Sequence, residues 1–251
     1  MNAFRDYSKV YDLFYGDKDY KAEAAYIQKL IKECNPSAES ILDLGCGTGR
    51  HATILQKYGY DVFGVDISSA MIEIAQKRNR SDFPAFIQGD IRTIRLKRKF
   101  DVVVSLFHVV NYQISDDDLL GTFRTARAHL NKGGIFIFDF WYGPAVLTDR
   151  PYPRVKKIET DDMTAIRIAE PCIQPNENIV DINYSIFIKD KHNKEIKEIN
   201  ELHRLRYLFM PEMRAMLKIA DFAVRNSLQW MSLHKELSLD SWLGAVVAEA
   251  K

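Results

Sequence analysis

Three glycines and an aspartate stand close together early in the chain, in the pattern of a turn that binds a ligand through its backbone. Asp43, Gly45, Gly47 and Gly49 lie between a short apolar run and a helical pattern that begins at Arg50. Glycine adopts positive φ angles and lets a ligand approach closely, and a helix N-terminus offers unpaired N–H groups. The pattern therefore predicts a cofactor-binding turn between a strand and a helix.

The spacing of these glycines also admits a dinucleotide. Counted from Gly45, the fingerprint G-x-G-x-x-G/A ends at Arg50, which is too large for close helix packing. Counted from Gly47, it ends at Ala52, which fits. The glycines alone therefore do not exclude a nicotinamide cofactor, but the fingerprint gives no role to Asp43.

Two more aspartates follow successive strand patterns. Asp66 closes the apolar run that reaches Val65, and Asp90 follows the run 83–88. A carboxylate can accept hydrogen bonds from both hydroxyls of a ribose, and open parallel sheets bind ligands at the carboxyl ends of their strands. Each aspartate alone could be a helix cap, but their order along the chain favours one shared site.

This combination resembles the class I S-adenosylmethionine-dependent methyltransferases. The turn Asp43-x-Gly45-x-Gly47-x-Gly49 resembles the first motif of that family, and Met71 stands where the family often has a methionine. The resemblance covers residues 40–140 and the final strand patterns of the chain. It implies a methyltransferase fold and S-adenosylmethionine as the cofactor.

The resemblance also implies a role for each aspartate. Asp43 would lie near the methionine part of the cofactor, Asp66 at the ribose hydroxyls and Asp90 near the adenine amino group. The full predicted cofactor-binding set is Tyr20, Asp43, Gly45, Gly47, Gly49, Asp66, Ile67, Met71, Asp90 and Ile91.

The segment after the fourth strand pattern bears on the methyl acceptor. Residues 105–112 read SLFHVVNY, without the acid-or-amide, Pro-Pro, aromatic element expected of enzymes that methylate exocyclic amines of nucleic-acid bases. An amine must be neutral when it attacks, whereas a hydroxyl acceptor usually needs a base or a metal. The sequence therefore disfavours base methylation.

The N-terminal segment is similar to the sugar N,N-dimethyltransferases, which act on nucleotide-linked amino sugars. The similarity rests on Tyr11-Asp12-x-x-Tyr15, on Lys18-Asp19-Tyr20, on an inserted β patch and on the aromatic residues 139–142. It implies a small-molecule acceptor, with an amine favoured over a hydroxyl.

Three side chains are predicted to act in catalysis, namely Tyr15, His108 and Tyr112. Some members of the sugar methyltransferase family have a histidine shortly after the fourth strand, where an ungapped alignment places Tyr112. His108 fits a core position as well as a site. Tyr15 and Tyr20 are expected to face the pocket because a lid must exclude water, whereas Tyr11 either packs on the core or contacts a ligand.

Two further pairs of residues each have two possible roles. Trp141 and Tyr142 either line the acceptor site or cap the sheet. Arg204 and Arg206 alternate along an expected strand and therefore share a face, where both could bind a phosphate. An exposed strand face is the favoured interpretation for the two arginines.

Strand and helix patterns alternate in the first part of the chain. This alternation implies right-handed βαβ units and a parallel sheet covered on both faces. The predicted helices are 20–34, 50–58, 69–78 and 116–130, and the predicted strands are 41–44, 60–65, 83–88, 100–106 and 135–140.

The pattern changes after Trp141. Residues 143–160 are rich in proline and glycine and are predicted to be mostly loop. Three strand patterns then follow without an intervening helix, which predicts an antiparallel patch. The predicted elements are strands 163–169, 178–188 and 196–209, helix 211–221, and final strands 222–231 and 242–249.

The predicted fold is therefore α/β, with a Rossmann-like, seven-stranded, mostly parallel sheet that ends in an antiparallel hairpin and an inserted antiparallel β patch. An NAD-type Rossmann domain has no reason to end in such a hairpin. Residues 1–142 and 210–251 are expected to form the core with an N-terminal lid helix. Residues 143–209 are expected to form an inserted lobe on the substrate side.

Composition excludes several classes of function. The net charge is +1, from 35 basic and 34 acidic residues, which argues against a long nucleic-acid partner. No apolar run approaches the ~20 residues that span a bilayer, and residues 1–18 contain no signal-like apolar stretch. The three scattered cysteines predict neither disulfides nor a structural zinc site, and no metal cluster stands out. The expected compartment is the cytoplasm.

The expected partner is a small-molecule acceptor, with neither nucleic acid nor membrane, and the expected state is a monomer or homodimer. Several alternatives stay open at this point. They are O-methylation of a small molecule, a nicotinamide-dependent oxidoreductase, a non-catalytic module that binds the cofactor or a partner protein, and a protein or RNA methyltransferase.

Overall fold

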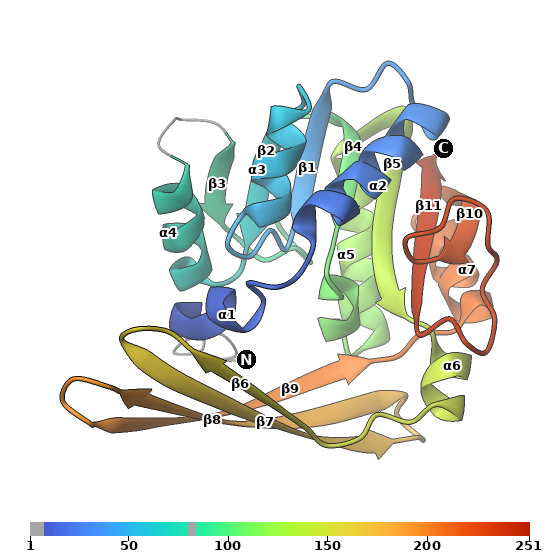
Figure 1. Ribbon diagram of the computed structural model, residues 1–251. Helices are drawn as coiled ribbons and strands as arrows, with labels where there is room; N and C mark the ends of the chain where they lie inside the picture. The colour runs from blue at the N-terminus through green and yellow to red at the C-terminus, as the bar shows by residue number, and fades with distance from the viewer. Residues whose placement is uncertain (1–7, 80–83) are drawn as a thin grey trace.

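The computed structural model describes residues 8–79 and 84–251, which contain a seven-stranded and a four-stranded sheet (Figure 1). The larger sheet has the order β10-β11-β5-β4-β1-β2-β3. The strands β1 to β5 run parallel to one another, and β10 and β11 form the antiparallel hairpin. The strands are β1 (Ser40–Leu44), β2 (Asp61–Asp66), β3 (Ala85–Gln88), β4 (Phe100–Ser105), β5 (Leu130–Trp141), β10 (Phe222–Gln229) and β11 (Leu243–Ala250).

Helices cover both faces of this sheet, so its strands are buried on both sides. In β4, Val103 packs into the core on one face, whereas Val102 and Val104 pack into the core on the other. This burial explains why the strand sequence is nearly continuous in apolar residues. One face carries α2 (Tyr20–Cys34), α3 (Arg50–Lys57) and α4 (Ser69–Arg78), and the other carries α5 (Asp116–Ala128) and α7 (Met210–Ile219).

Side-chain caps fix the loops that follow the strands. Ser68 accepts a hydrogen bond from the backbone N–H of Met71 at the start of α4. Ser115 caps α5 in the same way through Asp118. Each cap satisfies an N–H that would otherwise have no partner in the helix, so the loops after β2 and β4 meet their helices in a defined geometry.

The smaller sheet is antiparallel and confirms the predicted patch, but it has an additional strand. Its strands are β6 (Arg154–Glu159), β7 (Met163–Gln174), β8 (Ile179–Asp190) and β9 (Ile196–Arg206). The prediction that residues 143–160 are mostly loop is wrong, because α6 (Gly143–Thr148) and β6 fill much of that stretch. Pro144 stands in the first turn of α6, where a proline is tolerated.

The first predicted strand of the patch, 163–169, is also too short, since β7 continues to Gln174. The pairing of β6 with β7 ends at Ala169. Beyond that point β7 pairs only with β8, so its other side is a sheet edge. Pro171 lies in this edge stretch, where the missing N–H of proline is tolerated. A proline therefore did not end this strand.

The smaller sheet lies across the carboxyl ends of the parallel strands, with α1 (Ser8–Phe14) beside it (Figure 1). The structure thus gives two leading helices, α1 and α2, where one lid helix is predicted. The helix α1 packs on the smaller sheet through an apolar cluster of Val10, Phe14, Ala165, Ile186 and Ile199. The division of the chain into a core and an inserted lobe stays a prediction.

Arg206 contradicts the expectation of an exposed strand face. It is only 6% exposed, and its guanidinium pairs with Asp116 on α5 and Glu212 on α7. Arg204 is partly exposed and pairs with Asp181. Arg206 therefore anchors β9 to the helices of the larger sheet.

Within residues 8–79 and 84–251, no helix is both long and apolar enough to cross a membrane.

Candidate active site

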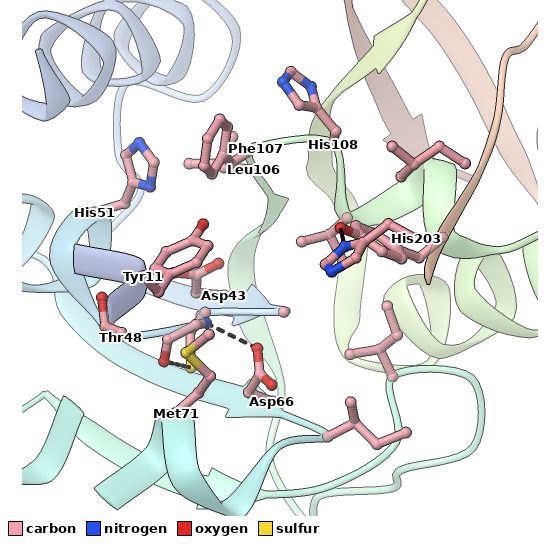
Figure 2. A pocket seen from close by; sticks show the side chains of 18 of the residues that line it. Tyr11, Asp43, Thr48, His51, Asp66, Met71, Leu106, Phe107, His108 and His203 are labelled. Carbon is pink, nitrogen blue, oxygen red and sulfur yellow. Dashed lines mark hydrogen bonds between the residues drawn. The ribbon is translucent and has the colours of Figure 1, made fainter. Parts of the chain in front are cut away.

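A cavity of about 490 Å³ opens at the carboxyl ends of β1, β2 and β4. Figure 2 shows Asp43, Thr48, Asp66 and Met71 on one side, with His108 and His203 on the other. Every residue predicted for the site lines this cavity except Gly49. The residues so placed are Tyr15, Tyr20, Asp43, Gly45, Gly47, Asp66, Ile67, Met71, Asp90, Ile91, His108 and Tyr112.

The three glycines of the turn all have positive φ but serve different purposes. A Cβ on Gly47 would meet no protein atom within 4 Å, so a ligand can approach its backbone from the cavity. A Cβ on Gly45 would collide with Val109. A Cβ on Gly49 would lie only 2.7 Å from the ring of Phe86. Glycine at this position therefore lets α3 pack closely on the sheet. Its assignment as a cofactor contact rests on the resemblance alone.

Two carboxyl groups stand at the ends of β1 and β2, of which Asp43 is buried and Asp66 is partly buried. The oxygens of Asp66 accept hydrogen bonds from the backbone N–H groups of Gly47 and Ser68, each at 2.9 Å. Burial raises the pKa of Asp66, and these hydrogen bonds oppose the rise. Asp43 is 2% exposed, and burial together with the nearby charge of Asp66 raises its pKa to about 7. A carboxyl group in this state is suited to meet a cationic ligand group.

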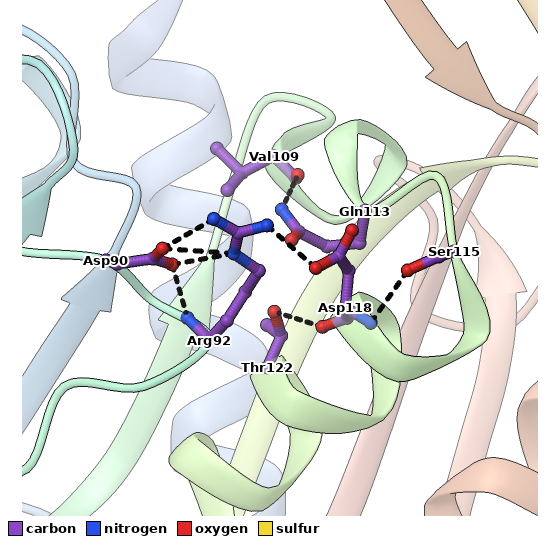
Figure 3. Close-up of polar contacts among 7 residues, drawn as sticks. All are labelled: Asp90, Arg92, Val109, Gln113, Ser115, Asp118 and Thr122. Atoms are coloured by element: carbon purple, nitrogen blue, oxygen red, sulfur yellow. Dashed lines mark hydrogen bonds and ion pairs between the residues drawn. The ribbon is translucent and has the colours of Figure 1, made fainter. Parts of the chain in front are cut away.

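Asp90 is held by an arginine from its own loop (Figure 3). Arg92 donates to both oxygens of Asp90, and its third nitrogen lies 2.7 Å from Asp118 on α5. The hydrogen bonds from Arg92 lower the pKa of Asp90, so its carboxylate stays ionised. The adjacent cavity wall is apolar, with side chains of Ile67, Met71 and Ile91.

Asp12 ties the N-terminal segment to the glycine-rich turn. Its carboxylate accepts hydrogen bonds from Thr48 Oγ1 and Arg50 Nε, each at 2.9 Å, and also pairs with Arg78. These partners belong to the turn, to α3 and to α4. The segment that the sequence suggests as a lid therefore contacts the end of the cavity that contains the glycine-rich turn.

Tyr20 lies at the same end of the cavity. Its ring centre is 5.0 Å from the guanidinium of Arg50, and burial raises the pKa of its hydroxyl, which stays protonated at neutral pH. Nearby, His51 Nε2 lies 2.7 Å from Glu23. Burial alone would raise the pKa of Glu23, but His51 and Lys18 outweigh it and hold that pKa at about 2.

Tyr15 joins the leading segment to the smaller sheet. Arg167 on β7 donates a hydrogen bond to the Tyr15 hydroxyl at 3.1 Å. The ring of Tyr15 also meets Phe107 edge to face, with 5.0 Å between centroids. Tyr11 lies beside it on the cavity wall and also packs against the apolar cluster of α1 and the smaller sheet, so both interpretations of Tyr11 stay open.

His108 stands at the cavity wall with a carboxylate behind it. Its Nδ1 lies 2.7 Å from Oδ2 of Asp139, which is 1% exposed on β5. The backbone N–H of His108 donates to the same carboxylate at 3.1 Å. Phe107 and His108 both have positive φ, which is uncommon outside glycine and typical of strained functional segments. The histidine thus lies at the site and not in the core.

Tyr112 reaches a histidine that the sequence analysis missed. It ends the short helix η1 (Val109–Tyr112), and its hydroxyl lies 2.8 Å from Nδ1 of His203 on β9. The other ring nitrogen of His203 lies 3.0 Å from Glu201. The alternation of residues 201, 203 and 205 along a strand was the available signal.

The two aromatic residues at the end of β5 each match one of the two interpretations. Trp141 lines the cavity, whereas Tyr142 packs against the core. Among residues 8–79 and 84–251, no three side chains of His, Cys, Asp or Glu are grouped to hold a metal ion.

The chain is similar in sequence and fold to known proteins. Residues 41–134 match a family described as a methyltransferase domain. The dTDP-3-amino-3,4,6-trideoxy-alpha-D-glucopyranose N,N-dimethyltransferase of Streptomyces venezuelae is 31% identical over 207 residues, 80% of this chain and 86% of the relative. The chain belongs to the S-adenosylmethionine-dependent methyltransferases.

Two further similarities agree with this assignment. The dTDP-3-amino-3,6-dideoxy-alpha-D-glucopyranose N,N-dimethyltransferase of Streptomyces fradiae is 28% identical, over 80% of this chain and 82% of the relative. A crystal structure of an S-adenosylmethionine-dependent methyltransferase from Clostridium acetobutylicum superposes with a TM-score of 0.83 at 25% identity, over 99% of both chains.

The predictions of fold class, enzyme class and cofactor are therefore confirmed. The protein is a methyltransferase that uses S-adenosylmethionine, and the alternatives of a nicotinamide-dependent oxidoreductase and of a non-catalytic module are set aside. The residues around the cavity fit this cofactor, since Gly47 leaves open space beside the carboxyl groups of Asp43 and Asp66 at the strand ends. The individual roles of the site residues remain predictions.

Proposed function

We propose that this methyltransferase transfers the methyl group of S-adenosylmethionine to the amino group of a nucleotide-linked amino sugar. One observation carries the proposal: a single cavity is lined by the aspartates at the ends of β1 and β2 and by His108 after β4, which has Asp139 of β5 behind it. The relatives from both Streptomyces species are named for dTDP-linked amino sugars. This cavity offers both a cofactor side and a base for an amine.

On the cofactor side, we propose a role for each residue at the strand ends. Asp66 accepts the ribose hydroxyls, Asp43 faces the methionine ammonium group, and the backbone of Gly47 lies against the ligand. When bound, the cofactor supplies an electrophilic methyl group on a sulfonium. The remaining contacts proposed are Tyr20, Gly45, Ile67, Met71, Asp90 and Ile91, with Gly49 supporting the turn through packing.

For the acceptor side, His108 acts as the general base. Asp139 lies next to Nδ1, so it favours a proton on that nitrogen and leaves the lone pair of Nε2 available. An ammonium group on the sugar gives its proton to Nε2 of His108, and the resulting neutral amine attacks. As the new N–C bond forms, the S–C bond of the sulfonium breaks and the electron pair stays on sulfur.

The leading segment and the smaller sheet complete the acceptor side. Tyr15 is held by Arg167, and Tyr112 is held by His203, so both hydroxyls have fixed positions at the cavity wall. Fixed neighbours lower the entropic cost of aligning an amine with the methyl group, and a closed cavity excludes water. In this proposal Tyr15 and Tyr112 orient the acceptor.

The test uses two matched acceptors. A dTDP-linked 3-amino sugar and the same sugar with a hydroxyl at that carbon are incubated with the protein and S-adenosylmethionine. Mass spectrometry should show methyl gain on the amino sugar alone. Methyl gain on the hydroxyl sugar alone would favour O-methylation instead. If neither sugar gains a methyl group while calorimetry shows that the cofactor binds, the proposed acceptor class is wrong.

We also propose that the enzyme is cytoplasmic and acts as a monomer or homodimer. Its partner is a small molecule and not a nucleic acid. Light scattering of the purified chain and activity in a fractionated cell extract test these points separately.

A further inference from the structure

One buried asparagine connects three segments around the acceptor side of the cavity. Asn111 lies in η1 and is fully buried. Its Nδ2 donates a hydrogen bond to the backbone carbonyl of Arg206 on β9 at 2.5 Å. Its Oδ1 accepts a hydrogen bond from the backbone N–H of Trp141 on β5 at 3.3 Å. A single side chain therefore forms a junction between η1 and strands of both sheets.

Both backbone partners of Asn111 lie where the pairing of a strand stops. The pairing of β4 with β5 ends at Ser105 and Phe138, before Trp141 is reached. The order of the smaller sheet ends at β9. A buried backbone N–H or C=O needs a partner, and an amide side chain offers both a donor and an acceptor. Asn111 thus supplies the hydrogen bonds that a neighbouring strand would supply. Because a carbonyl can only accept and an N–H can only donate, the two partners also fix the orientation of the amide.

The side chain of Arg206 reinforces the same junction. Its guanidinium is 8% exposed, lies 2.7 Å from Asp116 at the start of α5, and also pairs with Glu212 on α7. Shortly after it, the backbone N–H of Leu208 donates to the carbonyl of Trp141 at 2.9 Å. Both helices cover the larger sheet, so β9 is tied to that sheet through its backbone and through a side chain.

The residues held at this junction line the cavity. Trp141 lines it directly, Tyr112 follows Asn111 in the chain, and Leu205 precedes Arg206. They come from β5, η1 and β9. A shift at the junction would therefore displace all three together, whereas the loops after β1 and β2 keep hydrogen bonds of their own.

We propose that Asn111 is a positioning residue for the methyl acceptor. Through its two hydrogen bonds it sets the spacing of η1, the end of β5 and β9, and with it the shape of the acceptor side of the cavity. Asn111 acts through Trp141 and the cavity-lining neighbours of the junction, and the cofactor side does not depend on it. This inference rests on the proposed function, because it concerns the acceptor side of the same cavity.

The first test measures methyl transfer and cofactor binding. Asn111→Leu has a similar volume and removes both hydrogen bonds. Its kcat/KM for a dTDP-linked 3-amino sugar should fall ~10²-fold, as expected when reacting groups are misplaced by about 1 Å. The Kd of S-adenosylmethionine, measured by calorimetry, should stay at the wild-type value. An undiminished kcat/KM, or an equal loss of cofactor affinity, would overturn the inference.

Two further variants separate positioning from loss of stability. Asn35 also has a side-chain amide that donates to a backbone carbonyl, that of Asp101, but it lies at the opposite end of β4. Asn35→Leu should lower the unfolding temperature without lowering kcat/KM. If Asn111→Leu does not fold, Asn111→Ala takes its place, because water in the vacated space can satisfy both backbone groups without fixing their distance. The same fall in kcat/KM in Asn35→Leu would reduce the role of Asn111 to general stability.

The second test needs no sugar and separates this inference from the proposed function. Hydrogen exchange of the ligand-free protein is followed by mass spectrometry in wild type and in Asn111→Ala. Exchange should become faster in β9 and in residues 139–142, whereas residues 43–50 and 64–71 should keep the wild-type rate. No change at β9 and residues 139–142, or the same change in all four segments, would contradict the junction. If wild type methylates no amino sugar but the expected exchange pattern is present, only the proposed acceptor class is wrong.

Discussion

The two sides of the cavity are built in different ways. On the cofactor side, Gly47, Asp66 and Ser68 are joined by hydrogen bonds within the loops after β1 and β2. On the acceptor side, partners come from distant parts of the chain: Tyr112 meets His203 across 91 positions, and Tyr15 meets Arg167 across 152. One side is made by the sequence order of βα units, the other by the folding back of an inserted sheet.

This difference has a physical consequence. The cofactor side depends on backbone conformation and helix N-termini, which a short motif can encode. The acceptor side depends on side chains whose positions are set by the packing of β9 and α1, so it can be changed without disturbing the first side. Variants on one side should therefore leave the other intact, apart from residues that bridge the two.

The largest effect is expected on the acceptor side, from His108→Asn. Asparagine tolerates the positive φ of this position but is a poor base. Loss of the general base should lower kcat by ~10²–10⁴-fold, with the cofactor Kd unchanged. Steady-state kinetics and calorimetry measure the two quantities.

The matched control for this variant is His192→Asn, in an exposed turn of the smaller sheet, which should behave as wild type. A weaker cofactor Kd in His108→Asn would show that the two sides are not independent. Undiminished kcat would remove His108 from catalysis.

On the cofactor side, Asp66→Ala should weaken S-adenosylmethionine binding by ~100-fold. The reason is the loss of charged hydrogen bonds worth about 3 kcal/mol. Calorimetry measures the Kd, and circular dichroism checks the fold. Asp61→Ala, at the opposite end of the same strand, is the control and should bind normally. Equal affinity in the two variants would contradict the ribose assignment.

Asp12 bridges the two sides, because α1 packs on the smaller sheet and Asp12 binds the glycine-rich turn. Asp12→Ala should raise the KM of cofactor and acceptor together by ~10-fold, which corresponds to about 1.4 kcal/mol from partly exposed ion pairs. Asp17→Ala serves as control, since its exposed pair with Lys156 lies outside the cavity. A rise in only one KM would show that α1 serves a single side.

The smallest effect concerns the pH dependence of stability. The pKa of Asp43 is raised from 3.8 to about 7 by burial and by Asp66. Its neutral form therefore favours the ligand-free folded state, most fully below pH 3.8, and this contribution is lost as pH rises through about 7. In Asp43→Asn the contribution no longer depends on pH.

Thermal unfolding at pH 5 and pH 8 tests this sign. From pH 5 to pH 8, the Tm of the wild type should fall by a few degrees more than the Tm of Asp43→Asn. Each kcal/mol of lost stability lowers the Tm by ~2–4 °C. The same slope in both proteins would mean that Asp43 is already ionised in the folded state and that the aspartates do not oppose each other.

Particular elements show where prediction from sequence succeeded. The helices α2 and α4 begin and end where their apolar spacing predicts, and Asp43, Asp66 and Asp90 lie at the carboxyl ends of their strands as expected. Errors gathered around the insertion. The stretch around Pro171 was not predicted as strand, and the strand β6 was predicted as loop, because both depend on which neighbour strand is present.

The order of βα units, the glycine-rich turn and the acids at the strand ends can be predicted from the sequence, because these features depend on interactions between residues close in the chain. Tertiary packing, by contrast, places Asp139 behind His108 and His203 against Tyr112. It also decided that Arg206 is buried between β9 and two helices. These contacts arise when the smaller sheet packs across the ends of the larger one, and no local pattern specifies which side chains then meet.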